Sequence, residues 1–519
     1  MITLSGEARV TEVALHCPAH QEQVFRPVDS LAPRGSTYGY DVLAEIGRLR
    51  YEEHKQAGEI GEELGRCGIR IPTRTVSWLC QRYLTFAFAV HVESMPLLAS
   101  FLKRRGGYVL HIDGTGNRGA VVLLMKEGWS MFNLLAAHAE SEKAAHVAPL
   151  LRFLKKHLGS PVAAVSDDSK GLLSSLREVF PGTYVVLCHF HFLRDVGLKL
   201  FEPLYPRFRN RVDRRGVKGR LRSLRKTLRS ISTENGEATL ALEMVDYILA
   251  YREEGEGLAY PFSLPAVSFY RRCEEIRGEV RMAILDRAGR NLFSLSLSRL
   301  EDVLRLLEPP PNVLGRLYAD FLSLEERWRW FQRVRRALRY RNGPVPLSTH
   351  VRLSERELEK GRRRLDWVSR KIGEIVERGG GGKEGRELRR ALGRVGSYIE
   401  KHRGSLLAPN VSVMAGGKRV VKKIPRTNVP VESDYRLLRR HGRRITGSAD
   451  VESRVQGEGA GMLIARNLTD PRYVSLVYGS RSSLAERFSR VSPAAMQLAK
   501  SFMGSSHDDY GERNRLLPQ

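Results

Sequence analysis

Three acidic residues stand where this sequence could bring carboxylates together. Asp113 closes the apolar run Val109–Ile112, and Asp167 closes the run Val162–Ser166. Glu432 follows much later, after a Thr-Asn-Val-Pro-Val segment. A strand that stops at an aspartate delivers its carboxylate to one edge of a sheet, where several such groups can share divalent metal ions.

The overall charge indicates what such a cluster would act on. The 519-residue chain has 86 Lys and Arg against 58 Asp and Glu, a formal net charge of +28. Arginine dominates this excess, which favours bidentate contact with phosphate. A carboxylate cluster in so basic a protein predicts metal-assisted chemistry on a phosphate backbone. The length predicts roughly two to four domains.

The elements around the first two acids alternate in type. Apolar runs and helical periodicity predict strands at 108–113, 120–125, 131–137, 162–166 and 184–188, and helices at 142–157, at 171–179 and from His191. This βββαβαβα order predicts an α/β fold with a ribonuclease-H-like mixed sheet. The first strand of that sheet is central and the fourth lies beside it, so Asp113 and Asp167 are expected to be neighbours.

The rest of the chain divides by composition. We expect an irregular segment at 1–40, a helix-turn-helix domain at 41–95, the first part of a catalytic core at 105–200, a large all-α insertion at 201–420, a final core helix with the third acid at 421–460, and a C-terminal tail at 461–519. A four-glycine run at 379–382 predicts a flexible loop within the helical block.

The segment 41–86 predicts short helices around a glycine-containing turn, as in a helix-turn-helix. In its last helix the residues at core spacing are Val76, Leu79, Cys80 and Tyr83. The residues expected to face a DNA groove are Arg74, Ser77, Gln81 and Arg82. Short helical hairpins are also common in proteins that do not bind DNA.

Two further segments concentrate positive charge. Residues 207–229 carry eleven Lys and Arg offset only by Asp213, and we expect Arg214, Arg215 and Arg222 to contact DNA. The helix expected after Glu432 carries Arg436, Arg439 and Arg443 at three-to-four-residue spacing. A solvated helix face is the alternative interpretation of such a run.

The cysteines and the N-terminus indicate the compartment. Five scattered cysteines form no paired framework, which favours a reducing environment. Cys17 and His20 resemble half of a zinc ribbon, but no second pair follows at useful spacing. The N-terminus lacks a signal-peptide pattern, and no apolar run approaches the roughly 20 residues of a membrane span. We therefore expect a soluble intracellular protein.

Three segments carry a resemblance to a known family. They are His111-Ile-Asp-Gly-Thr115, the stretch from Val165-Ser-Asp-Asp168 through Phe180-Pro-Gly182 to Cys188-His-Phe-His191, and Thr427-Asn-Val-Pro-Val-Glu432 with its Arg-rich helix. Together they resemble the DDE transposases, specifically those of bacterial insertion sequences related to eukaryotic Mutator elements.

The resemblance implies an enzyme that binds the ends of a mobile DNA element and catalyses metal-dependent strand cleavage and strand transfer. Asp113, Asp167 and Glu432 would hold two Mg²⁺ or Mn²⁺ ions, with Asp113 bridging both. Cys188 and His191 would form a structural pair near the active site. The partners would be terminal inverted repeats, target DNA and at least one further copy of the chain, in the bacterial cytoplasm at the nucleoid.

The sequence also departs from the family pattern. Asp168 replaces the glycine that usually follows the second acid, so Asp167 and Asp168 both remain candidate ligands, with Asp167 favoured by register. The separation of 265 positions between Asp167 and Glu432 implies the large helical insertion. Two alternative functions remain: a transposase-derived DNA-binding protein without catalysis, and a ribonuclease-H-like nuclease that does not join strands.

Overall fold

The structure is a computed structural model that divides into two compact units. The sheet unit comprises Met1–Cys188, Thr349–Ser354 and Ala408–Gln519, and the helical unit comprises His189–Ser348 and Glu355–Leu407. The structure describes all residues except 12–14, 17–23, 26–29, 34, 118–119, 232–235, 254–257, 290–293, 308–315, 341–351, 380–381, 449–450 and 505–519. The half zinc ribbon expected at Cys17 and His20 lies among these residues.

A five-stranded mixed sheet forms the centre of the sheet unit, with the strand order β7-β6-β5-β8-β9. Its strands are β5 (Val109–Asn117), β6 (Ala120–Glu127), β7 (Asn133–Ala139), β8 (Ala163–Ser166) and β9 (Tyr184–Leu187). The first three pair antiparallel, whereas β8 and β9 are parallel to β5. All four residues of β8 are buried, as expected for a central parallel strand with both faces covered. The fold is therefore of the mixed α/β class.

The register of the sheet sets the two aspartates level with each other. The last pair that β5 makes with β8 joins His111 to Val165. Asp113 and Asp167 each lie two residues beyond that pair, so the two-residue period puts both on the same face. Contrary to the sequence prediction, β5 does not end at Asp113 but continues to Asn117, because its antiparallel pairing with β6 extends further than its pairing with β8.

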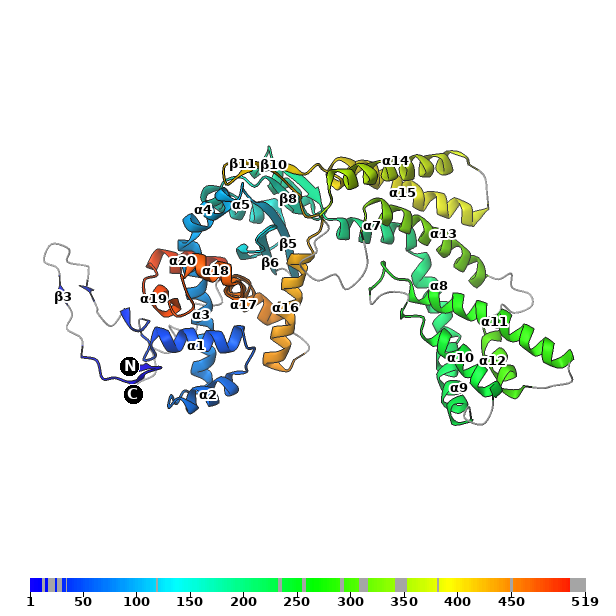
Figure 1. Cartoon of the computed structure of the whole chain (residues 1–519), viewed down its shortest axis with the longest axis horizontal. Coiled ribbons are helices and arrows are strands. Elements are labelled where there is room, and N and C mark those ends of the chain that lie inside the picture. Colours follow the sequence, from blue (N-terminus) through cyan, green and yellow to red (C-terminus); the bar gives the residue numbers. More distant parts are fainter. Residues whose placement is uncertain are drawn as a thin grey trace. The chain divides into compact units, whose positions relative to one another are not determined.

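Helices cover this sheet and pack against one another. They are α1 (Tyr40–Tyr51), α2 (Ala57–Arg66), α3 (Thr73–Glu93), α4 (Met95–Arg104), α5 (Ala144–Leu158), α6 (Lys170–Val179), α16 (Val429–Thr446), α17 (Glu452–Ala465), the 3₁₀ helix η3 (Arg466–Thr469), α18 (Pro471–Val477), α19 (Leu484–Ser489) and α20 (Pro493–Met503). Four two-residue strands, β1 (Ile2–Thr3), β2 (Gly6–Glu7), β3 (Leu15–His16) and β4 (Val24–Phe25), pair near the N-terminus. Figure 1 shows α16 and α17 beside β5 and β6.

The prediction that residues 461–519 form a C-terminal tail is wrong as far as Met503. Helices α17 and α20 pack against α3 and β7, and their apolar side chains join the main core. Gly461 of α17 illustrates how close this packing is, since a Cβ there would lie 2.8 Å from the Met503 methyl group and 3.0 Å from Leu84. The C-terminal segment is thus a structural part of the sheet unit.

The expected helix-turn-helix region forms three helices, α1 to α3. Val76, Leu79, Cys80 and Tyr83 are buried, as predicted. However, α3 is 21 residues long, and every residue from Tyr83 to Val92 is buried. The C-terminal half of α3 is therefore a core helix. In the described part of the chain no individual helix could cross a membrane, and only α3 and α4 taken as a pair bent by 53° reach the required length and apolarity.

The helical unit contains only helices among its described residues. They are α7 (His189–Phe201), α8 (Leu204–Arg214), α9 (Val217–Ile231), α10 (Gly236–Leu249), α11 (Pro265–Gly289), α12 (Leu295–Arg305), α13 (Arg316–Ala337), α14 (Glu355–Glu377) and α15 (Lys383–Leu406). The expected insertion at 201–420 needs two corrections. The unit already begins at His189, and the hairpin of β10 (Val411–Ala415) and β11 (Lys418–Lys422) belongs to the sheet unit.

One buried histidine of α3 makes the stability of the sheet unit depend on pH. His91 lies in the core, where its Nε2 is 2.9 Å from the Leu134 carbonyl oxygen and its Nδ1 is 2.7 Å from the Tyr473 hydroxyl. Burial lowers the pKa of His91 from 6.5 to about 4. The neutral ring is therefore the stable form, donating from Nε2 and accepting at Nδ1.

We expect this histidine to destabilise the fold in acid. Because its folded pKa is lowered, its contribution is fully present above pH 6.5 and is lost as the pH falls toward 4, by roughly 3 kcal/mol. Denaturant unfolding from pH 7 to 4 should show that much less loss in His91→Gln than in the native chain. His157→Gln is the comparison: this residue of α5 is partly exposed and burial also lowers its pKa, so the variant should change the slope less than His91→Gln. Identical pH dependence in all three proteins would contradict the prediction.

Candidate metal centre

The structure brings the three predicted acids to one place in the sheet unit. Asp113 lies on β5, Asp167 directly follows β8, and Glu432 lies in the first turn of α16. Carboxylate oxygens of Asp113 and Glu432 lie within 4.8 Å of each other. Asp113 is 6% exposed, whereas Asp167 and Glu432 are partly exposed. The buried carboxyl group of Asp113 therefore lies beside two carboxyl groups that are less buried.

The electrostatics of Asp113 show how close these groups are. Its pKa is raised well above 3.8, first by burial and then by the charges of Asp167 and Glu432, with a smaller contribution from Glu142. A hydrogen bond from the Gly114 N–H to Oδ1, at 2.9 Å, acts in the opposite direction. At an effective dielectric constant of about 20, two carboxylates 4–5 Å apart repel each other by roughly 3–4 kcal/mol. Oxygen ligands of this kind and spacing suit a hard divalent cation.

Asn428, at the start of α16, fixes the helix that carries Glu432. Its Nδ2 donates to the Ile112 carbonyl oxygen at 2.8 Å, and its Oδ1 lies 3.0 Å from His111 Nδ1. Its backbone N–H donates to Cys188 Sγ at 3.1 Å. These three bonds tie the first turn of α16 to the residues immediately before Asp113 and to the end of β9. Since Asn428 is completely buried, each bond is protected from water.

Further along α16, Tyr435 and Asp434 hold the helix to the sheet. The Tyr435 hydroxyl lies 2.8 Å from the carbonyl oxygen of Asp113 itself. Asp434 is buried and accepts from Lys126 Nζ on β6 and from Arg466 Nε, both at 2.6 Å. A buried carboxylate with two cations is compensated, so Asp434 is a structural acid. Glu432 lies two residues nearer the helix start and faces the aspartates instead.

The sequence analysis did not single out Glu142, a fourth carboxylate at this centre. It was expected to begin a helix, but α5 starts at Ala144 and Glu142 lies in the turn before it. Ser169 connects it to the second acid: the Ser169 hydroxyl donates to Glu142 Oε2 at 3.1 Å, and the Ser169 N–H donates to Asp167 Oδ1 at 3.1 Å. The signal in the sequence was an acid shortly after a strand, β7, much as Asp167 directly follows β8.

Two glycines make room for Glu142. A Cβ at Gly114 would lie 2.4 Å from Glu142 Oε1, and one at Gly171 would lie 1.8 Å from the Glu142 carbonyl oxygen. A side chain at Gly171 would displace the backbone of the turn that carries Glu142, and one at Gly114 would force the Glu142 carboxylate to move. These glycines are therefore explained by the close approach of three chain segments.

The charge contributions also bear on the choice between Asp167 and Asp168. Asp167 acts on the pKa of Asp113 and is held by the Ser169 N–H. It also has the register position level with Asp113 on β5. These observations favour Asp167 as the acid that works with Asp113.

The residues expected to contact DNA have different environments. Arg74 and Ser77 are exposed, but Arg82 is half-buried with its guanidinium carbon 4.6 Å from the Trp78 ring centroid. Arg214, Arg215 and Arg222 are exposed on α8, the turn after it, and α9. On α16, Arg436 and Arg443 are exposed, whereas Arg439 donates to Thr115 Oγ1 at 2.6 Å. Gln81 is half-buried.

Cys188 and His191 fall on opposite sides of the unit boundary. Cys188 is buried at the end of β9, where its sulfur accepts the Asn428 N–H. It therefore supports the helix that carries the third acid. His191 lies in α7, and its pKa is lowered to about 4, first by burial and then by Arg194.

No protein-family model matches this sequence, and no curated protein matches it significantly.

Replacing Asn428 should weaken the attachment of α16, the helix that carries Glu432. We expect Asn428→Ala to lower the free energy of unfolding by about 2–4 kcal/mol, because it removes two side-chain hydrogen bonds and leaves the buried Ile112 carbonyl without its donor. Denaturant unfolding measures the loss. Asn210→Ala, at an exposed position of α8, is the control and should cost less. Equal losses would contradict the structural role given to Asn428.

Proposed function

We propose that this protein is a DNA transposase that cuts and joins strands with divalent metal ions, through a ribonuclease-H-like core and the DDE set Asp113, Asp167 and Glu432. The observation that carries the proposal is the concentration of negative charge at Asp113, which is buried beside two further carboxylates from distant parts of the chain. Folded proteins rarely retain such a group without a function for it.

The donor set fits a pair of Mg²⁺ or Mn²⁺ ions. Asp113, Asp167 and Glu432 would hold these ions, since the charges of the other two acids both act on Asp113. When bound, two such ions promote deprotonation of an attacking water or DNA 3′-hydroxyl and stabilise the leaving 3′-oxygen. Asp113, Asp167 and Glu432 would supply carboxylate oxygens to the ions, and no covalent protein intermediate is required.

The other residues of the centre have positioning roles. Asn428, Tyr435 and Asp434 fix α16 so that Glu432 stays beside Asp113. Ser169 orients Asp167 and Glu142 together. Exposed Arg436 and Arg443 follow Glu432 on the same helix and would contact the phosphates beside the cleaved bond. The α1–α3 region would bind element ends, and two ends would require at least two copies of the chain.

Removing the carboxyl group of Asp113 should abolish the response to metal. Saturating Mg²⁺ or Mn²⁺ should stabilise the native protein by about 2.7 kcal/mol at 100 times the dissociation constant. Asp113→Asn should be more stable than the native chain in EDTA, because repulsion is relieved, and should not respond to metal. Thermal unfolding with and without metal measures both effects. If neither ion changes the thermal stability of the native protein, the proposal is wrong.

Strand chemistry can be tested on a supercoiled plasmid carrying this reading frame with its flanking DNA. With Mg²⁺ we expect cleaved and joined products, and about a 1,000-fold or greater loss in Asp113→Asn, Asp167→Asn and Glu432→Gln. Asp168→Asn, one residue from Asp167, is the matched control and should retain activity. Nicking without joining would indicate a nuclease, and binding without cleavage a DNA-binding protein; either result would overturn the transposase assignment.

The role of Ser169 can be separated from that of the acids. Ser169→Ala removes the hydroxyl that holds Glu142, while its backbone N–H still reaches Asp167. We expect about a tenfold loss of Mn²⁺ affinity by calorimetry, the lower end for a residue that orients a ligand. The control is Ser175→Ala on α6, whose hydroxyl bonds only to the Gly171 carbonyl. Unchanged Mn²⁺ affinity in Ser169→Ala would refute the bridging role.

A further inference from the structure

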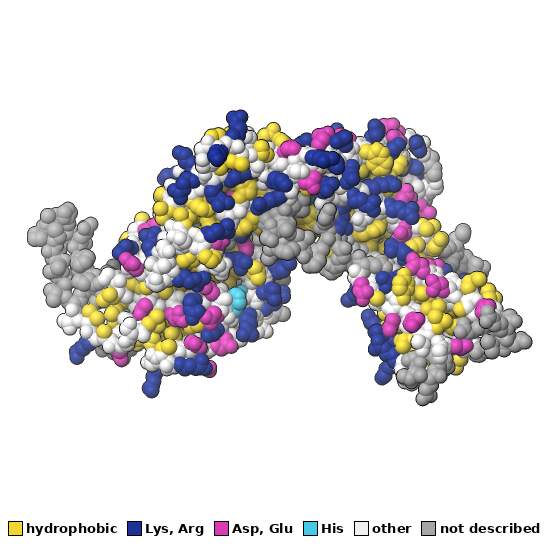
Figure 2. Space-filling model, in the orientation of Figure 1, with side chains coloured by type: hydrophobic (Ala, Val, Ile, Leu, Met, Phe, Trp, Pro, Cys, Tyr) yellow, Lys and Arg dark blue, Asp and Glu magenta, His cyan; other side chains and the backbone are white. Residues whose placement is uncertain are grey.

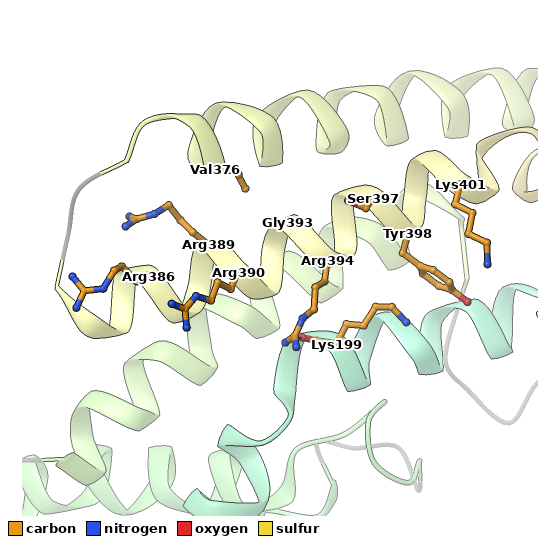
Figure 3. A pocket seen from close by; sticks show the side chains of 10 residues that line it. All are labelled: Lys199, Val376, Arg386, Arg389, Arg390, Gly393, Arg394, Ser397, Tyr398 and Lys401. Atoms are coloured by element: carbon orange, nitrogen blue, oxygen red, sulfur yellow. The ribbon is translucent and has the colours of Figure 1, made fainter.

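A basic groove in the helical unit is separate from the carboxylate centre. It encloses about 920 Å³ and is lined by α15 together with one residue each from α7 and α14. Figure 3 shows the lining side chains along α15, with Lys199 reaching in from α7. Six of the lining residues are cations: Lys199, Arg386, Arg389, Arg390, Arg394 and Lys401. Figure 2 shows Lys and Arg side chains gathered over the surface around α7 and α15.

The apolar core residues of α15 and the basic residues that line the groove lie on different faces of the helix. Its buried face is apolar, with Ala391, Leu392, Val395 and Ile399 in the core. The acids of its first turns act on α13 instead, since Glu384 and Glu387 both raise the pKa of Asp320 there. The arginines are left on the groove side, where Arg386, Arg390 and Arg394 are exposed at four-residue spacing. The groove therefore has a single sign of charge along its length.

The end of the groove near α7 is held in place by side-chain contacts. Arg394 Nη2 donates to the Lys199 carbonyl oxygen at 2.9 Å. Lys199 Nζ lies 3.9 Å from the Tyr398 ring centroid, and the Tyr398 hydroxyl donates to Asp195 at 3.0 Å. An ammonium group placed over an aromatic face in this way is ordered before any ligand arrives.

We propose that this groove, formed by α7 and α15, binds the phosphate backbone of duplex DNA independently of sequence. Residues 386 to 401 span about 22 Å of helix, and each four-residue step advances about 6 Å. A DNA strand presents one phosphate per 3.4 Å of its axis, so the row of cations can meet several phosphates at once. A small anion would use only one end of such a row.

The lining also argues against the reading of adenine and cytosine edges. Among the described residues it contains no Asn, Gln, Asp or Glu, which are the residues that recognise those edges. Contacts made only through Lys and Arg to phosphate position a duplex without selecting its sequence. The choice of DNA as the polyanion rests on the proposed function; the groove lies in the helical unit and none of its residues belongs to the DDE set.

The test compares two pairs of charge reversals on neighbouring helices. Arg386→Glu with Arg390→Glu changes the groove, and Arg356→Glu with Arg364→Glu changes exposed arginines of α14 outside it by the same net charge. The probe is a set of labelled 30-base-pair duplexes of unrelated sequence, titrated with the full-length chain in EDTA at several salt concentrations.

We expect the groove pair to weaken binding to every duplex by about tenfold or more at low salt. It should also reduce the slope of log affinity against log salt by about 2, one unit for each phosphate that the altered groove no longer neutralises. Arg386→Lys with Arg390→Lys should retain most of the affinity. Circular dichroism should show unchanged helix content in all variants.

The proposal is overturned if the two pairs of reversals behave alike, if the loss is confined to one duplex sequence, or if anionic lipid vesicles bind the native chain through these arginines while DNA does not. Because this titration contains no divalent metal, it is independent of strand cleavage. A groove that binds DNA in a protein without nuclease activity would refute the proposed function alone, and a cleaving protein whose affinity ignores the groove would refute this inference alone.

Discussion

The buried carboxyl group of Asp113, with two further carboxyl groups beside it, is the constraint on which the rest of the sheet unit depends. Burial and two neighbouring carboxylates all oppose its ionisation, so holding this group in place lowers the stability of the fold. The contacts that attach α16 to the sheet offset this loss of stability. They are chiefly the buried hydrogen bonds of Asn428, Tyr435 and Asp434. Without them, Glu432 would move away from Asp113 and relieve the repulsion.

Two acids on one helix show how the fold separates structural from functional charge. Glu432 and Asp434 are two residues apart on α16, so they project about 200° apart around the helix. Asp434 meets Lys126 and Arg466 and is neutralised in the core. Glu432 lies beside Asp113, a second acid, and its charge raises the pKa of that aspartate. The same residue chemistry therefore stabilises the fold on one face and destabilises it on the other.

The positive charge of the chain is organised as well. Many arginines form ion pairs within the helical unit, such as Arg211 with Asp320 and Arg271 with Glu325. The groove side of α15 gathers further arginines, Arg386, Arg390 and Arg394, beside Lys199 of α7. A net charge of +28 thus includes both internal pairing and surfaces of one sign, and only the latter attract a polyanion over distance.

The sequence by itself determined the strands, the helices between them and the identity of the three acids, because apolar runs, turns and their spacing are local properties. The element order also implied that β5 and β8 are neighbours, which their pairing confirms. The tertiary structure alone decided the C-terminal packing, the continuation of β5 beyond Asp113 and the nearness of Glu142, since these depend on partners distant in the chain. It also decided which arginines stay exposed: Arg439 and Arg436 look equivalent in the sequence, but only Arg439 has Thr115 within reach.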